Sequence, residues 1–86
     1  MSHNNEFLKF TSKELAILYF LTKGMTNKEI AGVLKISVGT LRTHLKNIYR
    51  KLNLDNRNAL VIWCTENKAQ IEEEIRFISS KKEILK

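Results

Sequence analysis

Residues 37–52 read SVGTLRTHLKNIYRKL, and this stretch decides the fold of the 86-residue chain. It contains no proline, and its apolar residues recur at the spacing of a single α-helical stripe. Its other faces carry four Lys or Arg residues and no Asp or Glu. A helix with this pattern suits a polyanion, and an α-helix also fits the major groove of B-DNA. The apolar stripe consists of Leu41, Leu45, Ile48 and Leu52.

The cationic face also has a simpler explanation, because basic residues on a solvated helix improve solubility. The distribution of charge along the chain bears on this choice. Of the net charge of +6, residues 26–57 hold seven Lys or Arg against two Asp or Glu. The thirds on either side carry net charges of only +1 and zero. A basic region of this kind is typical of proteins that bind nucleic acid or an anionic membrane.

The size and composition indicate one small helical domain. A chain of this length builds a single core, and the absence of proline favours helices joined by short connections. Cys64 is the only cysteine, so no intramolecular disulfide can form, which fits a reducing compartment such as the cytoplasm. No apolar run approaches the roughly 20 residues of a membrane span, and no signal-peptide segment is present. We expect a cytoplasmic protein that does not enter a membrane.

Nothing in the sequence indicates catalysis. The residues His3, His44 and Cys64 do not show the spacing of metal ligands. There is no glycine-rich phosphate loop, no G-x-S-x-G motif and no paired set of carboxylates. We therefore expect a protein that is not an enzyme and that holds no metal ion or cofactor.

Two capping boxes mark helix starts ahead of residues 37–52. In the pattern Thr-x-x-Glu each side chain bonds the backbone amide of the other residue, and it occurs at Thr11-Glu14 and Thr26-Glu29. The first box predicts a strongly apolar helix over about residues 12–23, which a glycine ends.

The second capping box opens a motif of two helices. It predicts a short helix over about residues 27–34, and Ser37 is the natural N-cap of a helix over residues 38–51. A tight turn separates the two. A short helix, a turn and a second helix with a basic polar face follow one another in the helix-turn-helix order, in which the second helix enters the major groove.

The two ends of the chain are less regular. Residues 1–9 read as a flexible N-terminal lead-in, although Phe7 and Phe10 can fold back onto the core. An apolar run predicts a fourth helix over residues 57–66. Residues 67–86 then form a fifth helix or a continuation of the fourth. Their apolar positions, which either cover the core or form a dimer seam, are Ile71, Ile75 and Ile78.

Residues 10–63 resemble the LuxR-type (GerE-like) helix-turn-helix domain of bacterial transcription regulators. The resemblance is most specific in the run TNKEIA at residues 26–31 and in the positions that follow it at fixed spacing. It implies an all-α fold of four helices, for support, scaffold, recognition and dimerisation, over residues 10–66. Residues 67–86 are then a C-terminal helical extension. The spaced positions are Ser37, Thr40, His44, Ile48, Lys51 and Leu52.

The resemblance also implies roles for individual residues. In the recognition helix, about 38–51, the residues facing base edges would be Arg42, Thr43 and Lys46. The residues near phosphates would be Lys28, Ser37, Thr40, Asn47 and Arg50. The fourth helix would pair with its twin in a dimer through Ala59, Leu60, Ile62 and Trp63.

The sequence departs from the family pattern at three positions. Ser12 stands where proline is usual, Ala16 stands where a glutamate is usual, and Thr43 is shorter than the Lys or Arg that would make a stronger base contact. No receiver or ligand-sensing domain precedes the motif in this sequence. It is therefore either a fragment or a stand-alone regulator, and the sequence leaves both open.

The leading hypothesis for function is sequence-specific binding of double-stranded DNA by a transcription regulator, as a homodimer on an inverted repeat. The alternative is an adaptor of the transcription machinery that contacts RNA polymerase and for which DNA binding is secondary. A steep salt dependence of DNA affinity favours the first hypothesis. Polymerase association that survives loss of Arg42 and Lys46 favours the second.

Overall fold

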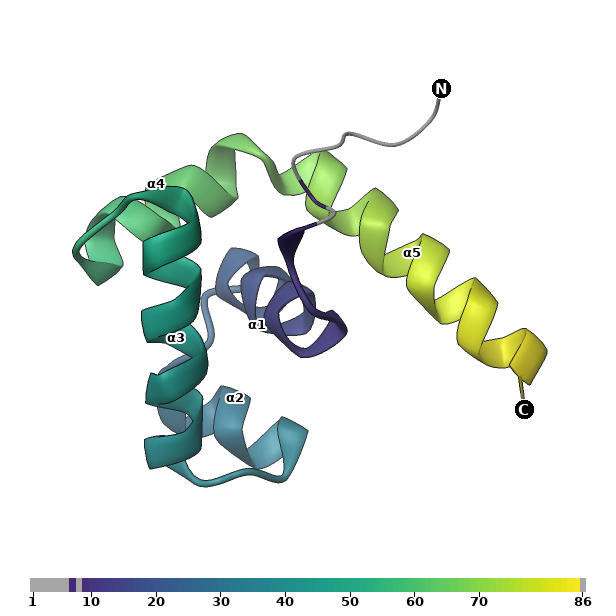
Figure 1. Cartoon of the computed structure of the whole chain (residues 1–86), viewed down its shortest axis with the longest axis horizontal. Coiled ribbons are helices and arrows are strands. Elements are labelled where there is room, and N and C mark those ends of the chain that lie inside the picture. Colours follow the sequence, from purple (N-terminus) through teal and green to yellow (C-terminus); the bar gives the residue numbers. More distant parts are fainter. Residues whose placement is uncertain (1–6, 8, 86) are drawn as a thin grey trace.

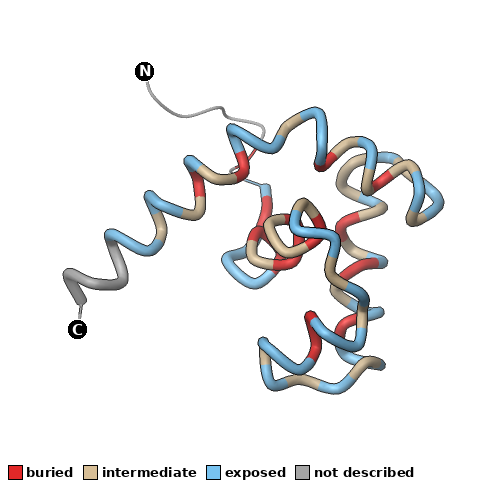
Figure 2. Tube along the Cα trace, turned by 180° about the vertical axis from the view of Figure 1, so that it is seen from behind, coloured by how far each residue is buried: buried red, intermediate tan, exposed pale blue. Residues whose placement is uncertain are grey.

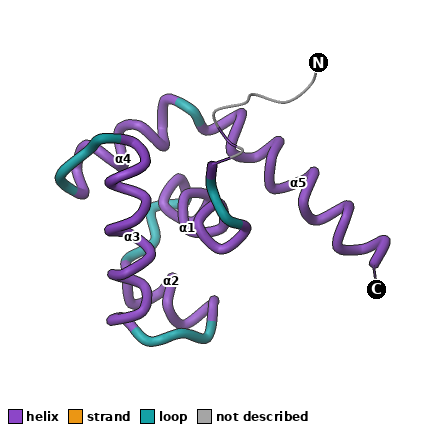
Figure 3. Tube along the Cα trace, viewed as in Figure 1, coloured by secondary structure: helices purple, strands orange, loops and turns teal. Residues whose placement is uncertain are grey.

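Five α-helices and no strand make up the part of the chain that the structure describes (Figures 1 and 3). The structure is a computed structural model, and it describes Phe7 and residues 9–85, with side chains as far as Ser80. The predicted all-α fold is confirmed. The helices are α1 (Ser12–Thr22), α2 (Asn27–Leu34), α3 (Val38–Leu52), α4 (Arg57–Glu66) and α5 (Lys68–Leu85).

The helix boundaries follow from local hydrogen bonds at the helix ends. Both predicted capping boxes are formed, with Thr11 and Glu14 bonding each other's backbone amides at 2.9 and 3.0 Å. The box of Thr26 and Glu29 does the same for α2. A single residue, Asn67, separates α4 from α5, and its amide bonds the carbonyl oxygens that end α4. Residues 68–85 are thus a fifth helix and do not continue the fourth.

The core is built around α1, which contacts α3, α4 and α5 (Figure 1). Because neighbours lie on several sides, α1 buries residues around much of its circumference, and Figure 2 shows buried segments gathered on it. On α3 the burial is confined to one stripe, which leaves the opposite face to solvent. The buried residues of α1 are Glu14, Leu15, Ile17, Leu18 and Leu21.

Both ends of the described chain contribute to this core. Phe7 and Phe10 are buried, and their ring centroids lie 6.0 and 6.3 Å from that of Trp63. Phe7 therefore belongs to the packed domain, whereas residues 1–6 and 8 of the predicted lead-in lie outside the described residues. At the other end, Ile71 has no exposed surface and Ile75 packs against the same core. Ile78 packs against it as well, so α5 covers the core at least as far as this residue.

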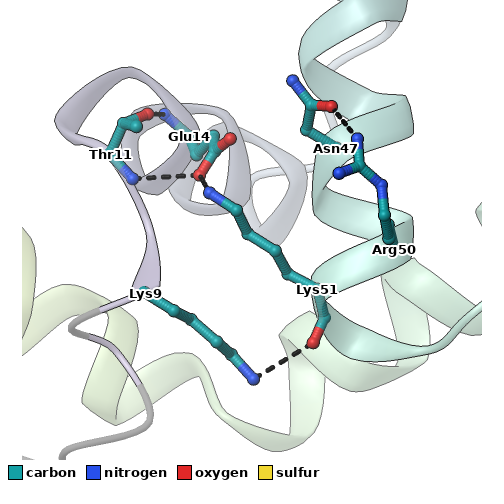
Figure 4. A network of polar contacts seen from close by, with 6 residues as sticks. All are labelled: Lys9, Thr11, Glu14, Asn47, Arg50 and Lys51. Carbon is teal, nitrogen blue, oxygen red and sulfur yellow. Dashed lines mark hydrogen bonds and ion pairs between the residues drawn. The ribbon is translucent and has the colours of Figure 1, made fainter.

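A buried ion pair joins the start of α1 to the end of α3 (Figure 4). Glu14 is only 3% exposed, and its Oε1 accepts hydrogen bonds from the Nζ of Lys51 at 2.7 Å and from the amide of Thr11 at 2.9 Å. The ammonium group of Lys9 donates to the backbone carbonyl of Lys51 at 3.1 Å. These contacts fix the C-terminal end of α3 against α1 and the segment that precedes it.

The two capping boxes form a matched pair that isolates the contribution of this ion pair. Glutamine keeps the capping function of glutamate. We expect Glu29→Gln, on the surface, to change the free energy of unfolding by less than about 0.5 kcal/mol. We expect Glu14→Gln to lower it by about 1–3 kcal/mol, because Lys51 loses its buried anion but is partly exposed and regains some hydration. Equal changes in a urea titration would mean that the ion pair does not stabilise the fold.

Candidate nucleic-acid interface

α3 lies along one edge of the helix assembly (Figure 1). α2 packs against α3, and the turn of residues 35–37 joins them in the predicted helix-turn-helix arrangement. Leu41, Leu45 and Ile48 face the core, and the residues between them are exposed except for His44 and Asn47, which are half-buried. This arrangement presents the basic side of α3 as a continuous convex ridge.

The three residues that the sequence assigned to base edges lie together on this ridge. Arg42, Thr43 and Lys46 are all exposed. Lys46 lies three residues after Thr43 and four after Arg42, so it neighbours both of them on the surface of the helix. The hydroxyl of Thr43 donates to the backbone carbonyl of Gly39 at 3.3 Å, so this hydroxyl turns toward the helix backbone. Two long cations therefore flank a short side chain whose polar end is already bonded.

The residues assigned to phosphates surround this group. Lys28 is exposed in the first turn of α2, and Arg50 is exposed two turns along α3 from Thr43. Asn47 is half-buried, and its Oδ1 accepts a hydrogen bond from the guanidinium of Arg50. Arg50 thus keeps further N–H groups for another acceptor.

The hydroxyls at the start of α3 bond one another. Ser37 is the N-cap, and its Oγ accepts from the amide of Thr40 at 3.0 Å. The Ser37 hydroxyl donates to the Oγ1 of Thr40 at 3.0 Å. The hydrogen of Ser37 is consequently in use within the cap, while the hydroxyl hydrogen of Thr40 is available for an external acceptor. The two residues are adjacent but differ in what they can offer to a phosphate.

The start of α2 is held in place by α4. The guanidinium of Arg57 donates to the Oδ1 of Asn27 and to the carbonyl of Met25, the latter at 3.1 Å. Arg57 is the first residue of α4. The side chain of Lys28, next to Asn27, is therefore attached to a helix start that is anchored from outside the helix-turn-helix motif.

Lys35 is a basic residue of this region that the sequence reasoning assigned only to a turn. It is exposed and adopts the left-handed conformation, with φ of 59°, at the C-cap of α2. A non-glycine residue in this conformation costs about 1–2 kcal/mol. The signal in the sequence was a lysine at a helix end where Gly or Asn is favoured. The residue lies in the turn between α2 and α3.

The residues assigned to a dimer surface do not form one patch. Leu60 has no exposed surface and lies in the core, so it does not belong on the outer face of α4, contrary to the prediction. Trp63 is half-buried against Phe7 and Phe10. Ala59 is partly exposed and Ile62 is 53% exposed. The apolar run alone did not identify which side of α4 the core would take.

Other chemistry is sparse in the described part of the chain. Burial raises the pKa of the Cys64 thiol to about 12, so the thiol stays protonated at neutral pH and is a poor nucleophile. The described side chains contain no group of three or more His, Cys, Asp or Glu that could hold a metal ion. Among the described helices, none combines the length and the apolar character that a membrane span requires.

Comparison with known proteins agrees with the geometry of α2 and α3. A family model described as "Bacterial regulatory proteins, luxR family" matches residues 8–64, about two thirds of the chain. The chain belongs to the LuxR family. The family provides the DNA-binding domains of bacterial transcription regulators, so the predicted resemblance is confirmed. No solved structure matches the chain significantly.

Several curated relatives of this LuxR-family domain are longer proteins. The chain is 41% identical over 61 residues to the "Nitrate/nitrite response regulator protein NarP" of Escherichia coli, covering 71% of this chain and 28% of that protein. It is 38% identical over 65 residues to the "CsgBAC operon transcriptional regulatory protein" of Escherichia coli, covering 76% and 30%. It is 37% identical over 57 residues to the "Response regulator protein VraR" of Staphylococcus aureus, covering 66% and 27%. The chain thus spans less than a third of these relatives.

The unequal bonding of Ser37 and Thr40 leads to a prediction that separates stability from binding. We expect Ser37→Ala to lower the free energy of unfolding by about 1 kcal/mol, because α3 loses its N-cap. We expect Thr40→Val to change it by less than about 0.5 kcal/mol and to weaken binding to duplex DNA, because a free hydroxyl donor is lost. Urea titrations and fluorescence anisotropy with labelled DNA measure the two effects. A Thr40→Val domain with unchanged DNA affinity would exclude the hydroxyl as a contact.

Proposed function

We propose that this LuxR-family domain binds double-stranded DNA sequence-specifically by placing α3 in the major groove. The observation that carries the proposal is the exposed ridge of α3, where Arg42, Thr43 and Lys46 lie on one face. α3 contains no Asp or Glu, so none of its own side chains repels phosphates. Family membership supports DNA binding, and the ridge supports base reading by these three residues.

The residues around the ridge would fix its register on the duplex through the phosphate backbone. Lys28 and Arg50 offer charged donors on either side of the ridge, and Thr40 offers a hydroxyl. Ser37 and Asn47 act mainly by supporting these neighbours, since each bonds one of them. Phosphate contacts of this kind position a protein without reading sequence.

The names of the relatives support a role in transcription regulation. Two of the named relatives are response regulators and another is an operon transcriptional regulatory protein. We place this domain in the same kind of process, in the bacterial cytoplasm where the DNA lies. Regulated genes and activating signals are properties of the whole relatives, of which the chain spans less than a third.

We further propose that two copies pair through the outer face of α4 on an inverted repeat. Ile62 is the large apolar residue exposed on this face, and Ala59 is partly exposed beside it. Burying one isoleucine side chain contributes only about 1.5–3 kcal/mol, which is too little for a stable dimer in dilute solution. Pairing would therefore occur on DNA, where two half-sites hold the copies close together.

The two classes of contact predict different responses to substitution. We expect Arg42→Ala to lower affinity for a selected operator by about 1–3 kcal/mol more than affinity for random DNA. We expect Lys28→Ala to weaken both equally and to flatten the slope of log affinity against log salt by about 0.9. Filter binding or fluorescence anisotropy measures the affinities for operator and random DNA. Repeating the titration at salt concentrations from about 50 to about 200 mM gives the slope.

Equal losses on operator and random DNA in Arg42→Ala would place Arg42 among the phosphate contacts. The alternative function, an adaptor that contacts RNA polymerase, has its own signature. Polymerase association that persists in a variant lacking both Arg42 and Lys46 would favour that alternative over DNA binding.

The pairing of two copies can be tested with one substitution on α4. We expect the domain to be monomeric by light scattering without DNA, and to bind two half-sites about 10 base pairs apart cooperatively. Ile62→Glu should abolish the cooperativity and leave affinity for a single half-site unchanged, because α3 is not altered. The exposed residue Ser79 on α5 provides a control, since Ser79→Glu introduces the same charge away from α4 and should keep the cooperativity. Independent binding of two half-sites by the unmodified domain would rule out the pairing.

A further inference from the structure

The ridge of α3 offers hydrogen-bond donors in preference to acceptors. Arg42 and Lys46 carry donors only. The acceptor oxygen of Asn47 is engaged by the guanidinium of Arg50, which is a charge-assisted bond. The hydroxyl of Thr43 donates its one hydrogen to the carbonyl of Gly39, so its oxygen keeps acceptor capacity but is turned toward the helix backbone, and we assign the γ-methyl to contact with a ligand. No carboxylate is present on α3 to accept from a base.

The chemistry of base edges in the major groove then limits what such a ridge can read. Guanine presents two acceptors, N7 and O6, and thymine presents the acceptor O4 and a methyl group. Cytosine presents an amino donor, and adenine presents one beside its N7. Asparagine usually reads adenine through both amide atoms. In this domain Asn47 is half-buried, and one of the two lone pairs of its oxygen already accepts from Arg50, which holds the amide against that side chain.

We propose that α3 reads the keto bases guanine and thymine on the strand that it contacts. Arg42 and Lys46 donate to O6 and N7 of guanine or to O4 of thymine, and Thr43 contacts a thymine methyl group. Asn47 takes no part in reading adenine. This inference rests on the proposed function, since it names the bases that the DNA-binding face selects.

The first test is selection of bound duplexes from a random-sequence pool by the unmodified domain. Parallel selections with Arg42→Ala, Thr43→Ser and Lys46→Ala identify the positions that each residue reads, because the base preference there changes. The expected half-site has G or T at these positions on one strand. Every base pair contains one keto base, so the contacted base of each pair is identified by placing 7-deazaguanine or deoxyuridine in the selected duplex. Affinity that these substitutions leave unchanged at all of the positions would overturn the inference and leave the proposed function intact. A pool that shows no enrichment, together with equal affinity for all duplexes, would overturn the proposed function itself.

The second test uses modified bases in the selected duplex. Replacing the contacted thymine by deoxyuridine removes one methyl group and should weaken binding about fourfold. Thr43→Val keeps the methyl branch and should retain this difference, while Thr43→Ser should bind both duplexes equally. A thymine preference that survives in Thr43→Ser would overturn the methyl contact. Circular dichroism of both variants establishes that α3 is intact, which is expected because Thr43 is exposed.

The third test addresses Asn47 and the long cations. Asn47→Ala should select the same half-site as the unmodified domain. If the variant loses a preference for adenine at any position, Asn47 does read a base and this part of the inference is wrong. Replacing a contacted guanine by 7-deazaguanine should weaken binding about 5- to 100-fold, since one acceptor of a paired contact is removed. The loss should disappear in Arg42→Ala or Lys46→Ala, whichever contacts that base. If it persists in both, neither cation reads guanine.

Discussion

The bond between Glu14 and Lys51 is the contact on which the position of α3 against the rest of the domain depends. A recognition helix reads bases only if its angle to the rest of the domain is fixed, because a groove tolerates little displacement. A buried apolar stripe anchors α3 along its length, but apolar packing alone lets a helix rotate about its axis or shift along it by small amounts. The short bond from Lys51 to a carboxylate that α1 itself orients removes this freedom at the C-terminal end. At the N-terminal end, the turn from α2 and the anchoring of α2 by Arg57 do the same.

The buried carboxylate of Glu14 also accepts from the backbone amide of Thr11, which fixes its orientation. Glu14 is oriented by its capping bond with Thr11, so the same residue starts α1 and holds α3. Lys9 adds a bond to the carbonyl of Lys51, which brings the segment before α1 into the same network (Figure 4). A local folding signal and a long-range contact thus meet in one side chain. Such agreement between local and tertiary preferences is what a uniquely folded sequence requires.

The elements of the fold were predictable because their signals are local. Capping boxes at Thr11 and Thr26 and the N-cap at Ser37 mark helix starts within a few residues, and the structure places all three as predicted. Which face of α4 the core takes was not predictable, since its consecutive apolar residues give no stripe, and Leu60 was misassigned for this reason. The role of Lys9 also escaped prediction, because nothing in a sequence links a lysine to a backbone carbonyl 42 residues away.

The fifth helix has a consequence for how the domain is made. α1 lies at the start of the chain, but Ile71, which closes the core against it, lies some fifty residues later. A ribosome adds residues at about 5–20 per second and retains the most recent ones in its tunnel. During synthesis α1 therefore waits for seconds with part of its apolar surface uncovered, while the recognition helix has already emerged. The surface of α1 that α5 covers is therefore buried only after Ile71 has been released, later than the residues that form the contacts of α1 with α3.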